Sequence, residues 1–305
     1  MTIEQRVERM FNPGGSTPVG TGFPLVPFAS LPAASTVEGQ VRRLTELPHV
    51  SLIALSGKWR PFGGRQVLAQ RSVNPVTVQS LSDFKAETIG PFPGGLVRAG
   101  MRVECREVFS SGGLGTNPRL TYLYAGPSGG VGTNGLFAYY NNTINDIDGN
   151  GEIVGRISVL SDASANHRAT PASGPNASGV YPLTGGYFHS TVPALTPLVD
   201  FSAPWAIDIV MRSAAETAVA ISTATWVGGV ATYNTSAVHT LAVGDKTTIA
   251  GVDLAGYNGV VIVTSVPTTT QFTAVIADPG GSGTGGTSSR ISNMISQSYV
   301  LELVG

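Results

Sequence analysis

Short runs of threonine, valine and isoleucine, each ended by glycine, asparagine, aspartate or proline, restrict the possible folds of this chain more than any other feature. They are clearest in residues 230–252, 256–266 and 271–276. β-Branched residues favour strands, and the residues between the runs favour tight turns. Helical periodicity is absent except in short pieces such as residues 3–11. The sequence therefore predicts an all-β fold.

The composition is typical of a turn-rich β-protein, part of whose apolar surface is covered by other subunits. Charged residues make up only 12% of the 305 residues, whereas 39 glycines and 20 prolines supply many turns. A formal net charge of −1 provides no electrostatic footprint for nucleic acid, and no apolar run reaches the length of a membrane span. We therefore expect no nucleic-acid partner and no membrane insertion.

The strand-like runs divide the chain into a large β-domain and a smaller module inserted into it. Eight runs between residues 76 and 226 predict a jelly-roll-like β-sandwich, which residues 291–305 complete with a final strand. Residues 227–290 are expected to form the inserted β-module. The glycine-rich end of this module, residues 280–286, is expected to be a flexible linker.

The N-terminal part is predicted to contain an anchor and a small neck. Residues 1–35 are rich in proline and glycine, so we expect an extended arm that becomes ordered only along another protein. Residues 36–75 predict a small β-hairpin neck with little core of its own. We therefore expect Trp59 and Phe62 to pack against copies of themselves in a homotrimer. The alternative is that Trp59 packs on residues 76–92 of its own chain.

Three sequence patterns resemble parts of tailed-bacteriophage virion proteins. The pattern L-x-V-G-D-x-x-x-I-x-G-V of residues 241–252 resembles immunoglobulin-like modules that are inserted into phage structural proteins. The pattern G-x-W-R-P-x-G-G-R-x-V-L-A of residues 57–69 is similar to a small module on the N-terminal side of tail fibres and spikes. The pattern G-L-V-R-A-G-M-R-V of residues 95–103 resembles the start of their distal jelly-roll domains.

The resemblance implies a non-enzymatic virion structural protein that is assembled in the host cytoplasm, and the charged residues 1–10 do not resemble a secretory signal. Such a protein would be a homotrimeric fibre or spike on the tail or capsid. It would dock to other virion proteins through residues 1–35 and contribute to attachment to a host-surface glycan or protein. The alternatives are a head decoration or cement protein, a tail adaptor and, more distantly, a polysaccharide depolymerase.

Residues 146–153 resemble the first half of a calcium-binding loop. Asp146, Asp148 and Asn150 place oxygen atoms at alternate positions, as a hard cation requires. The twelfth position is Ile157, so the bidentate carboxylate that completes such a loop is missing. A solvated turn is therefore the favoured interpretation, and no cofactor is expected.

Catalytic motifs are not recognisable in the sequence. Glycoside hydrolysis needs two carboxylates at one site, but Glu104 and Glu107 should lie on opposite faces of one strand. The G-x-S-x-G match of residues 126–130 lies in a proline- and glycine-rich turn cluster between strands, and the histidines are expected at the surface or at subunit interfaces. We therefore predict a protein that is not an enzyme, with no catalytic, cofactor-binding or metal-binding residues. The side chains considered were Asp83, Glu87, Glu104, Glu107, Asp162, Asp200, Asp208, His49, His167, His189 and His239.

Other distinctive side chains are expected to lie mainly in the core. Met101, Val103 and Cys105 alternate along a strand, so they should share a buried face with Cys105 as an unreactive thiol. An aromatic group should also lie mainly inside the sandwich, with Tyr140 as the member placed to line a sugar-binding surface. Its members are Tyr122, Tyr124, Phe137, Tyr139 and Tyr140.

Overall fold

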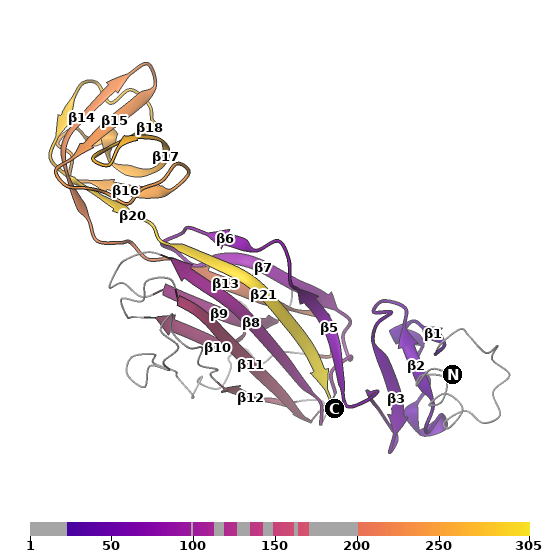
Figure 1. Ribbon diagram of the computed structural model, residues 1–305. Coiled ribbons are helices and arrows are strands. Elements are labelled where there is room, and N and C mark those ends of the chain that lie inside the picture. The colour runs from indigo at the N-terminus through magenta and orange to yellow at the C-terminus, as the bar shows by residue number, and fades with distance from the viewer. Residues whose placement is uncertain are drawn as a thin grey trace.

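The protein is described here from a computed structural model that covers residues 23–98, 100–112, 119–126, 135–142, 149–161, 164–170 and 201–305. Three β-rich units follow one another along the molecule: a small N-terminal sheet, a two-sheet sandwich and a barrel (Figure 1). The helical pieces in the described residues are three 3-10 turns, η1 (Phe28–Ser30), η2 (Ala34–Thr36) and η3 (Ala255–Tyr257). The predicted all-β fold is confirmed.

The N-terminal sheet has the strand order β1-β2-β3-β4. Its strands are β1 (Leu25–Val26), β2 (Val41–Leu44), β3 (Ser51–Leu55) and β4 (Lys58–Pro61). Trp59 is only 2% exposed, and its indole nitrogen donates to the carbonyl oxygen of Pro32 at 2.9 Å. The expectation that Trp59 packs against other subunits is therefore wrong, because the segment around η2 covers its ring within the same chain.

Phe62 lies where the N-terminal sheet meets the sandwich. Its ring is half-buried and makes an edge-on contact with Phe23, with 5.3 Å between centroids. It also lines a groove of about 360 Å³ together with Pro61 and Gly305. Much of this ring is thus covered by its own chain as well.

The sandwich consists of two sheets with the orders β12-β11-β8-β21-β5 and β10-β9-β13-β7, and β6 pairs with β21. The chain passes between the two sheets at most connections, which gives the double Greek-key order of a jelly roll. Its strands are β5 (Arg65–Arg71), β6 (Val76–Val78), β7 (Phe84–Phe92), β8 (Arg102–Gly112), β9 (Arg119–Gly126), β10 (Gly135–Asn142), β11 (Gly149–Ser161), β12 (Ser164–Thr170), β13 (Trp205–Arg212) and β21 (Asn293–Val304).

Alternation along the strands creates the jelly-roll core. Val103, Cys105, Ile207 and Leu301 point between the two sheets and are fully buried. The expected buried face of β8 is therefore present, and Cys105 is a free buried thiol. The core excludes water from both inner faces, which is the main favourable term in the stability of such a sandwich.

One strand of the jelly roll differs from the expected division of the chain. β5 was expected in the neck, but it pairs with β21 from Arg65 opposite Val304 to Arg71 opposite Tyr299. β21 lies between β5 and β8, so the C-terminal strand is an interior strand of its sheet. Its 12 residues are long enough to pair along both neighbours.

The inserted unit is a closed β-barrel in which pairing runs β14-β15-β18-β17-β16-β20 and back to β14. Its strands are β14 (Val219–Val227), β15 (Val230–Thr235), β16 (Lys246–Ala250), β17 (Gly259–Thr268), β18 (Gln271–Val275), β19 (Gly283–Thr284) and β20 (Thr287–Arg290). β14 was expected in the jelly roll, but it forms a hairpin with β15 and belongs to the barrel.

Closure of the barrel differs from the immunoglobulin-like sandwich that the sequence pattern suggested, because such a sandwich keeps two separate sheets. β14 pairs first with β20 and then with β15, and β17 likewise joins β16 to β18. Register shifts after Ile221 and after Val263 occur where these two strands change partner. Bulges bend strands, so they allow each strand to serve both sides of the barrel.

The glycine-rich segment of residues 280–286 is part of the barrel wall. A Cβ atom on Gly283 would lie 2.7 Å from Val252 Cγ1, and one on Gly286 would lie 2.6 Å from the backbone nitrogen of Val252. The expectation of a flexible linker is therefore wrong. These glycines permit close packing of the segment containing β19 against residues around Val252.

Candidate functional site: the barrel face and its junction

The barrel joins the jelly roll through two adjacent chain segments. Ala215 and Ile291 form an antiparallel bridge, and the backbone nitrogen of Ser292 donates to the carbonyl oxygen of Ala214 at 2.8 Å. Glu216 N donates to Arg290 O, also at 2.8 Å. Paired backbone segments resist bending more than two separate tethers, so the junction restricts movement of the barrel.

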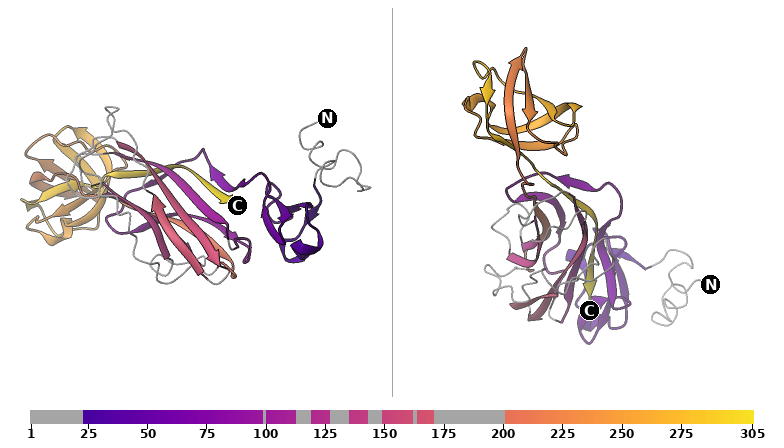
Figure 2. Two further views of the ribbon diagram at one scale, coloured as in Figure 1. Left: turned by 90° about the horizontal axis from the view of Figure 1, so that it is seen from below. Right: turned by 60° about the vertical axis from the view of Figure 1, so that its left-hand side comes forward.

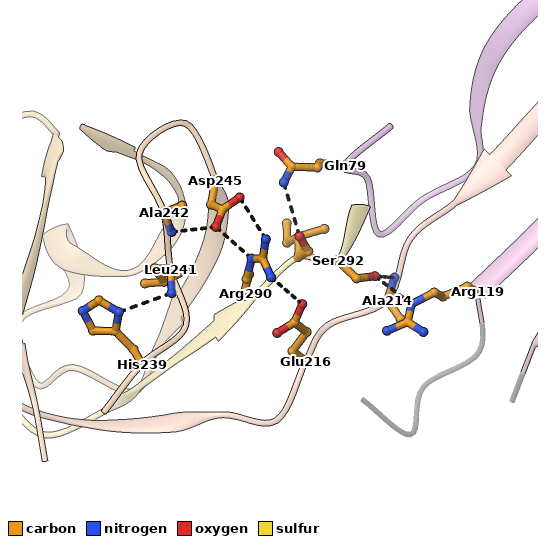
Figure 3. A network of polar contacts seen from close by, with 11 residues as sticks. Gln79, Arg119, Ala214, Glu216, His239, Leu241, Ala242, Asp245, Arg290 and Ser292 are labelled. Carbon is orange, nitrogen blue, oxygen red and sulfur yellow. Dashed lines mark hydrogen bonds and ion pairs between the residues drawn. The ribbon is translucent and has the colours of Figure 1, made fainter. Parts of the chain in front are cut away.

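Arg290 connects the junction to a barrel loop (Figure 3). Its guanidinium group donates to both carboxylate oxygens of Asp245, at 2.8 and 3.3 Å, and to Glu216 Oε1 at 3.3 Å. The same Asp245 carboxylate accepts a hydrogen bond from Ala242 N at 2.8 Å. A two-point arginine–carboxylate contact fixes direction as well as distance.

Ser292 connects the junction to the jelly roll. Its hydroxyl oxygen lies 3.1 Å from both Arg119 Nε and Ala214 N, each of which donates to it (Figure 3). Lys246 adds a contact from the barrel, since its ammonium group donates to Gln79 O at 3.4 Å. Polar contacts from both units therefore converge on the two connecting segments.

The candidate binding surface lies on the outside of β14, β15 and β18. Antiparallel register aligns outward side chains in three rows across these strands. We call this surface the outer face; its rows are Thr223–Asn234–Gln271, Thr225–Thr232–Thr273 and Val227–Val230–Val275. All nine side chains are uncharged and none is buried.

Hydrogen bonds fix the amide row of the outer face. Asn234 Nδ2 donates to Thr223 Oγ1 at 2.9 Å, and Gln271 Nε2 donates to Asn234 Oδ1 at 2.8 Å. In the valine row, Val227 and Val275 are 79% and 68% exposed. The inward residues that alternate with the outward ones along these strands, including Ala224 and Phe272, form the barrel core. Two-residue alternation in T-A-T-W-V and Q-F-T-A-V was the sequence signal for this face, and it was missed.

Two of the predicted carboxylates lie near each other inside the jelly roll. Glu107 has 0% exposure, and burial raises its pKa to about 8, with a further increase from the negative charge of Glu87. Glu87 is ion-paired with Arg71 at 3.0 Å, and the Arg71 guanidinium lies over the ring of Tyr299. A carboxyl group with a raised pKa beside a second carboxyl group suits acid–base chemistry. However, Glu107 has no exposed surface that a substrate could contact, so we assign this group to the core.

Glu104 points to the other face of β8 and is surrounded by arginines. Arg156 Nε lies 2.8 Å from its carboxylate, and Arg102 and Arg65 lie at 3.5 and 3.7 Å. Burial raises the pKa of Glu104, but these three cations outweigh it and hold the pKa below its ordinary value. The expected separation of Glu104 from Glu107 is thus observed.

The other carboxylates considered also serve structural contacts or lie outside the described residues. Asp208 is buried and accepts a hydrogen bond from Thr88 Oγ1 at 2.5 Å, and Asp83 is ion-paired with Arg212 at 2.9 Å. Asp162 and Asp200 are outside the described residues.

Only the part of the calcium-like loop from residue 149 onward lies within the described residues. Asp146 and Asp148 lie outside the described residues, and only the backbone of Asn150 is described, within β11. In the part of the chain that the structure describes, no three His, Cys, Asp or Glu side chains are arranged to hold a metal ion. Among the same residues, no helix has the length and apolar character needed to cross a bilayer.

The histidines have different positions. His239 was expected at a surface or interface, but it is buried in the barrel, with its ring edge-on to Phe272 at 5.4 Å and Nδ1 accepting from Leu241 N. His49 is exposed and its Nε2 lies 3.0 Å from Leu68 O. The His167 side chain and the whole of His189 are outside what the structure describes.

The tyrosines of β9 correct another expectation. Leu123 and Ala125 face the jelly-roll core, whereas Tyr122 and Tyr124 occupy the alternate positions on the outer side and are half-buried. They share a face, as predicted, but it is not the core face, because alternation places them opposite Leu123. The side chains of Phe137, Tyr139 and Tyr140 lie outside the description.

Comparisons of the chain with protein-family models, with curated proteins and with solved structures found no match.

Proposed function

We propose that this chain is a non-enzymatic structural protein of a tailed-bacteriophage virion, a fibre or spike that contributes to attachment to the host surface. The observation that carries this proposal is the position of the barrel. It projects from one end of the jelly roll, while the N-terminal sheet lies at the other end (Figures 1 and 2). A chain that is anchored through residues 1–35 would present its barrel farthest from the anchor.

The junction supports a role in display. Arg290 and Ser292 hold the two connecting segments by contacts to both neighbouring units. A binding unit with a restricted orientation loses less conformational freedom when several copies bind one surface. In the homotrimer that we propose, weak binding by each barrel would therefore add up to firm attachment.

The resemblance of three sequence patterns to phage fibre and spike proteins supports the same class of function. The trimer does not rest on Trp59, which is covered by its own chain. It rests on the resemblance and on the low content of charged residues, 12% of the chain.

Labelling of particles that contain this chain tests the proposal. Antibodies that recognise the surface of the barrel should bind intact virions and reduce the adsorption of these virions to bacterial cells. Antibodies against the N-terminal sheet, used as a control, should have a smaller effect on adsorption. Barrels that are inaccessible in intact particles would contradict a fibre or spike and favour the tail adaptor or decoration protein.

A further inference from the structure

We propose that the outer face of β14, β15 and β18 binds a short stretch of uncharged polysaccharide. This inference rests on the proposed function and specifies both the site and the chemical class of its ligand. The face lies on the barrel, the unit that the proposed function places outermost. β14 begins near the junction and is nine residues long, so the valine row at its far end is roughly 30 Å from its first residue.

The amide row is prepared for recognition of hydroxyl groups. In the chain of hydrogen bonds from Gln271 to Asn234 to Thr223, each amide is held in one orientation before any ligand arrives. Gln271 Oε1 and the Thr223 hydroxyl hydrogen remain at the two ends of this chain, one as an acceptor and the other as a donor. Ligand binding therefore requires little further ordering of these side chains.

The middle row has the same character. Thr273 Oγ1 lies within hydrogen-bonding distance of Thr264 Oγ1 and Ser265 Oγ, at 2.9 and 2.7 Å. Thr225 is exposed at the other end of the row. Hydroxyl groups both donate and accept, so they match the mixed donors and acceptors of a sugar.

The valine row supplies an apolar border. Val230 lies between Val227 and Val275 in register and is 37% exposed. Three adjacent exposed valines form a small apolar strip beside two polar rows. A sugar ring presents C–H groups on its faces and hydroxyl groups around its edge, so it can contact the strip and the polar rows together.

Charge favours a neutral ligand over an acidic one. Residues 219–290 contain five charged side chains, and none belongs to the outer face: Asp245, Lys246, Asp253, Asp278 and Arg290. Asp245 and Arg290 neutralise each other at the junction. The face therefore has no cation to pair with a uronate, sulfate or phosphate group.

Area favours an oligosaccharide over a protein. Three strands about 4.8 Å apart, each covered over a span of five residues that includes three outward side chains, give a face of roughly 250 Å². A stable protein–protein interface buries about 800 Å² on each partner. The face is therefore too small to hold a second protein by itself, but it is large enough for a few sugar units. Single sites should bind weakly, and several copies should add avidity.

The experiment uses the full chain and a panel of uncharged glucose, galactose, mannose and N-acetylglucosamine oligosaccharides in ligand-observed NMR. Thr225→Lys places a long charged side chain at the β14 end of the middle row of the face. The matched control is Val260→Lys, at a 59% exposed position where β17 pairs with β16 on another side of the barrel. Asn234→Asp is a second variant that keeps side-chain size but removes the amide donor to Thr223.

We expect at least one uncharged oligosaccharide to bind the native chain and the Val260→Lys control equally. Thr225→Lys and Asn234→Asp should each weaken binding tenfold or more. Lack of binding by every oligosaccharide, equal loss in Val260→Lys, or binding only to phosphatidylcholine vesicles through the valines would overturn the proposal.

Adsorption of the same variants to a panel of bacterial strains separates this proposal from the proposed function. If the native chain adsorbs and Thr225→Lys adsorbs equally well, attachment stands but the outer face is not its site. If the native chain adsorbs to none of the strains, the attachment function itself fails.

Discussion

Arg290 and Asp245 form a two-point ion pair, 2.8 and 3.3 Å between the paired atoms, at the base of the inserted barrel. Arg290 is the last residue of β20, and Asp245 immediately precedes β16. The pair therefore joins the end of β20, where the chain leaves the barrel, to the loop that precedes β16. Glu216, on the entering segment, accepts from the same guanidinium group.

Arg290→Met should loosen this junction. The change leaves the largely buried carboxylate of Asp245 without its cation and removes one hydrogen-bond donor from Glu216, so we expect the barrel to lose about 3 kcal/mol of stability. Hydrogen exchange of the backbone amides of β14 to β20, followed as a function of urea concentration, measures the loss in the barrel.

The control is Arg65→Met, which removes a more exposed arginine paired with Glu302 in the jelly roll. Glu104, which Arg65 also contacts, keeps Arg102 and Arg156, so this change should cost less than about 1 kcal/mol. Equal costs would contradict the role of Arg290.

Gly286→Ala should destabilise the barrel more than Gly228→Ala. Both glycines have positive φ, +88° and +58°, so both substitutions carry backbone strain of about 1 kcal/mol or more. Only at Gly286 would the added Cβ atom meet the backbone, 2.6 Å from Val252 N, while at Gly228 there is nothing within 4 Å. We expect a difference of at least about 2 kcal/mol in barrel unfolding. Equal effects would indicate that residues 280–286 act as a linker after all.

Glu107→Gln should change how the stability of the jelly roll depends on pH. Burial raises the pKa of Glu107 from 4.5 to about 8, so between these pH values the folded protein keeps a proton that the unfolded chain releases. The free energy of unfolding should therefore fall as pH rises from about 4.5 to about 8, and this loss should be complete above pH 8.

The glutamine variant has no such proton. Near pH 8.5 it should be about 2–4 kcal/mol more stable than the native chain, and near pH 4.5 the two should be similar. Thermal or urea unfolding across this range provides the measurement. Glu152→Gln is the control, because Glu152 is a more exposed carboxylate paired with Arg106. A native chain whose stability rises between pH 5 and 8 relative to Glu107→Gln would refute this account of the core.

Trp59→Ala should destabilise the N-terminal sheet without changing the number of subunits. The ring is covered by its own chain, so its removal creates a cavity worth about 3–5 kcal/mol within one subunit. Analytical ultracentrifugation should give the same mass for the native chain and the variant, while hydrogen exchange in β3 and β4 should increase. Dissociation into monomers without loss of protection in the sheet would restore the intersubunit interpretation.

The sequence was sufficient to predict the all-β fold, because alternation at positions such as Val103 and Cys105 depends only on neighbouring residues. It also placed the C-terminal strand in the same domain as the strands before the insertion. It did not show that β14 belongs to the barrel, since Ile221 and Ala224 would be equally suitable for a jelly-roll core. That choice depends on long-range pairing with β15 and β20.

Glycine-rich segments and isolated aromatic residues were the least predictable. Gly283 and Gly286 belong to a segment whose composition is that of a linker. The need for glycine at both positions becomes clear only from the structure, because Val252 leaves no room there for a Cβ atom. Burial of Trp59 depends on the carbonyl group of Pro32, which the sequence does not place near it. Prediction of the outer face would have required the register between three strands, because its rows form only when residues such as Thr223, Asn234 and Gln271 are aligned.

Removal of the barrel tests most directly whether this unit is responsible for attachment. Ala215 and Ile291 face each other across the junction, so a two-residue Asn-Gly turn in place of residues 216–290 can join the two segments. The shortened chain should keep a folded jelly roll, with β21 still paired between β5 and β8, and should lose adsorption to bacterial cells to which the full chain binds. Undiminished adsorption of the folded, shortened chain would contradict the account.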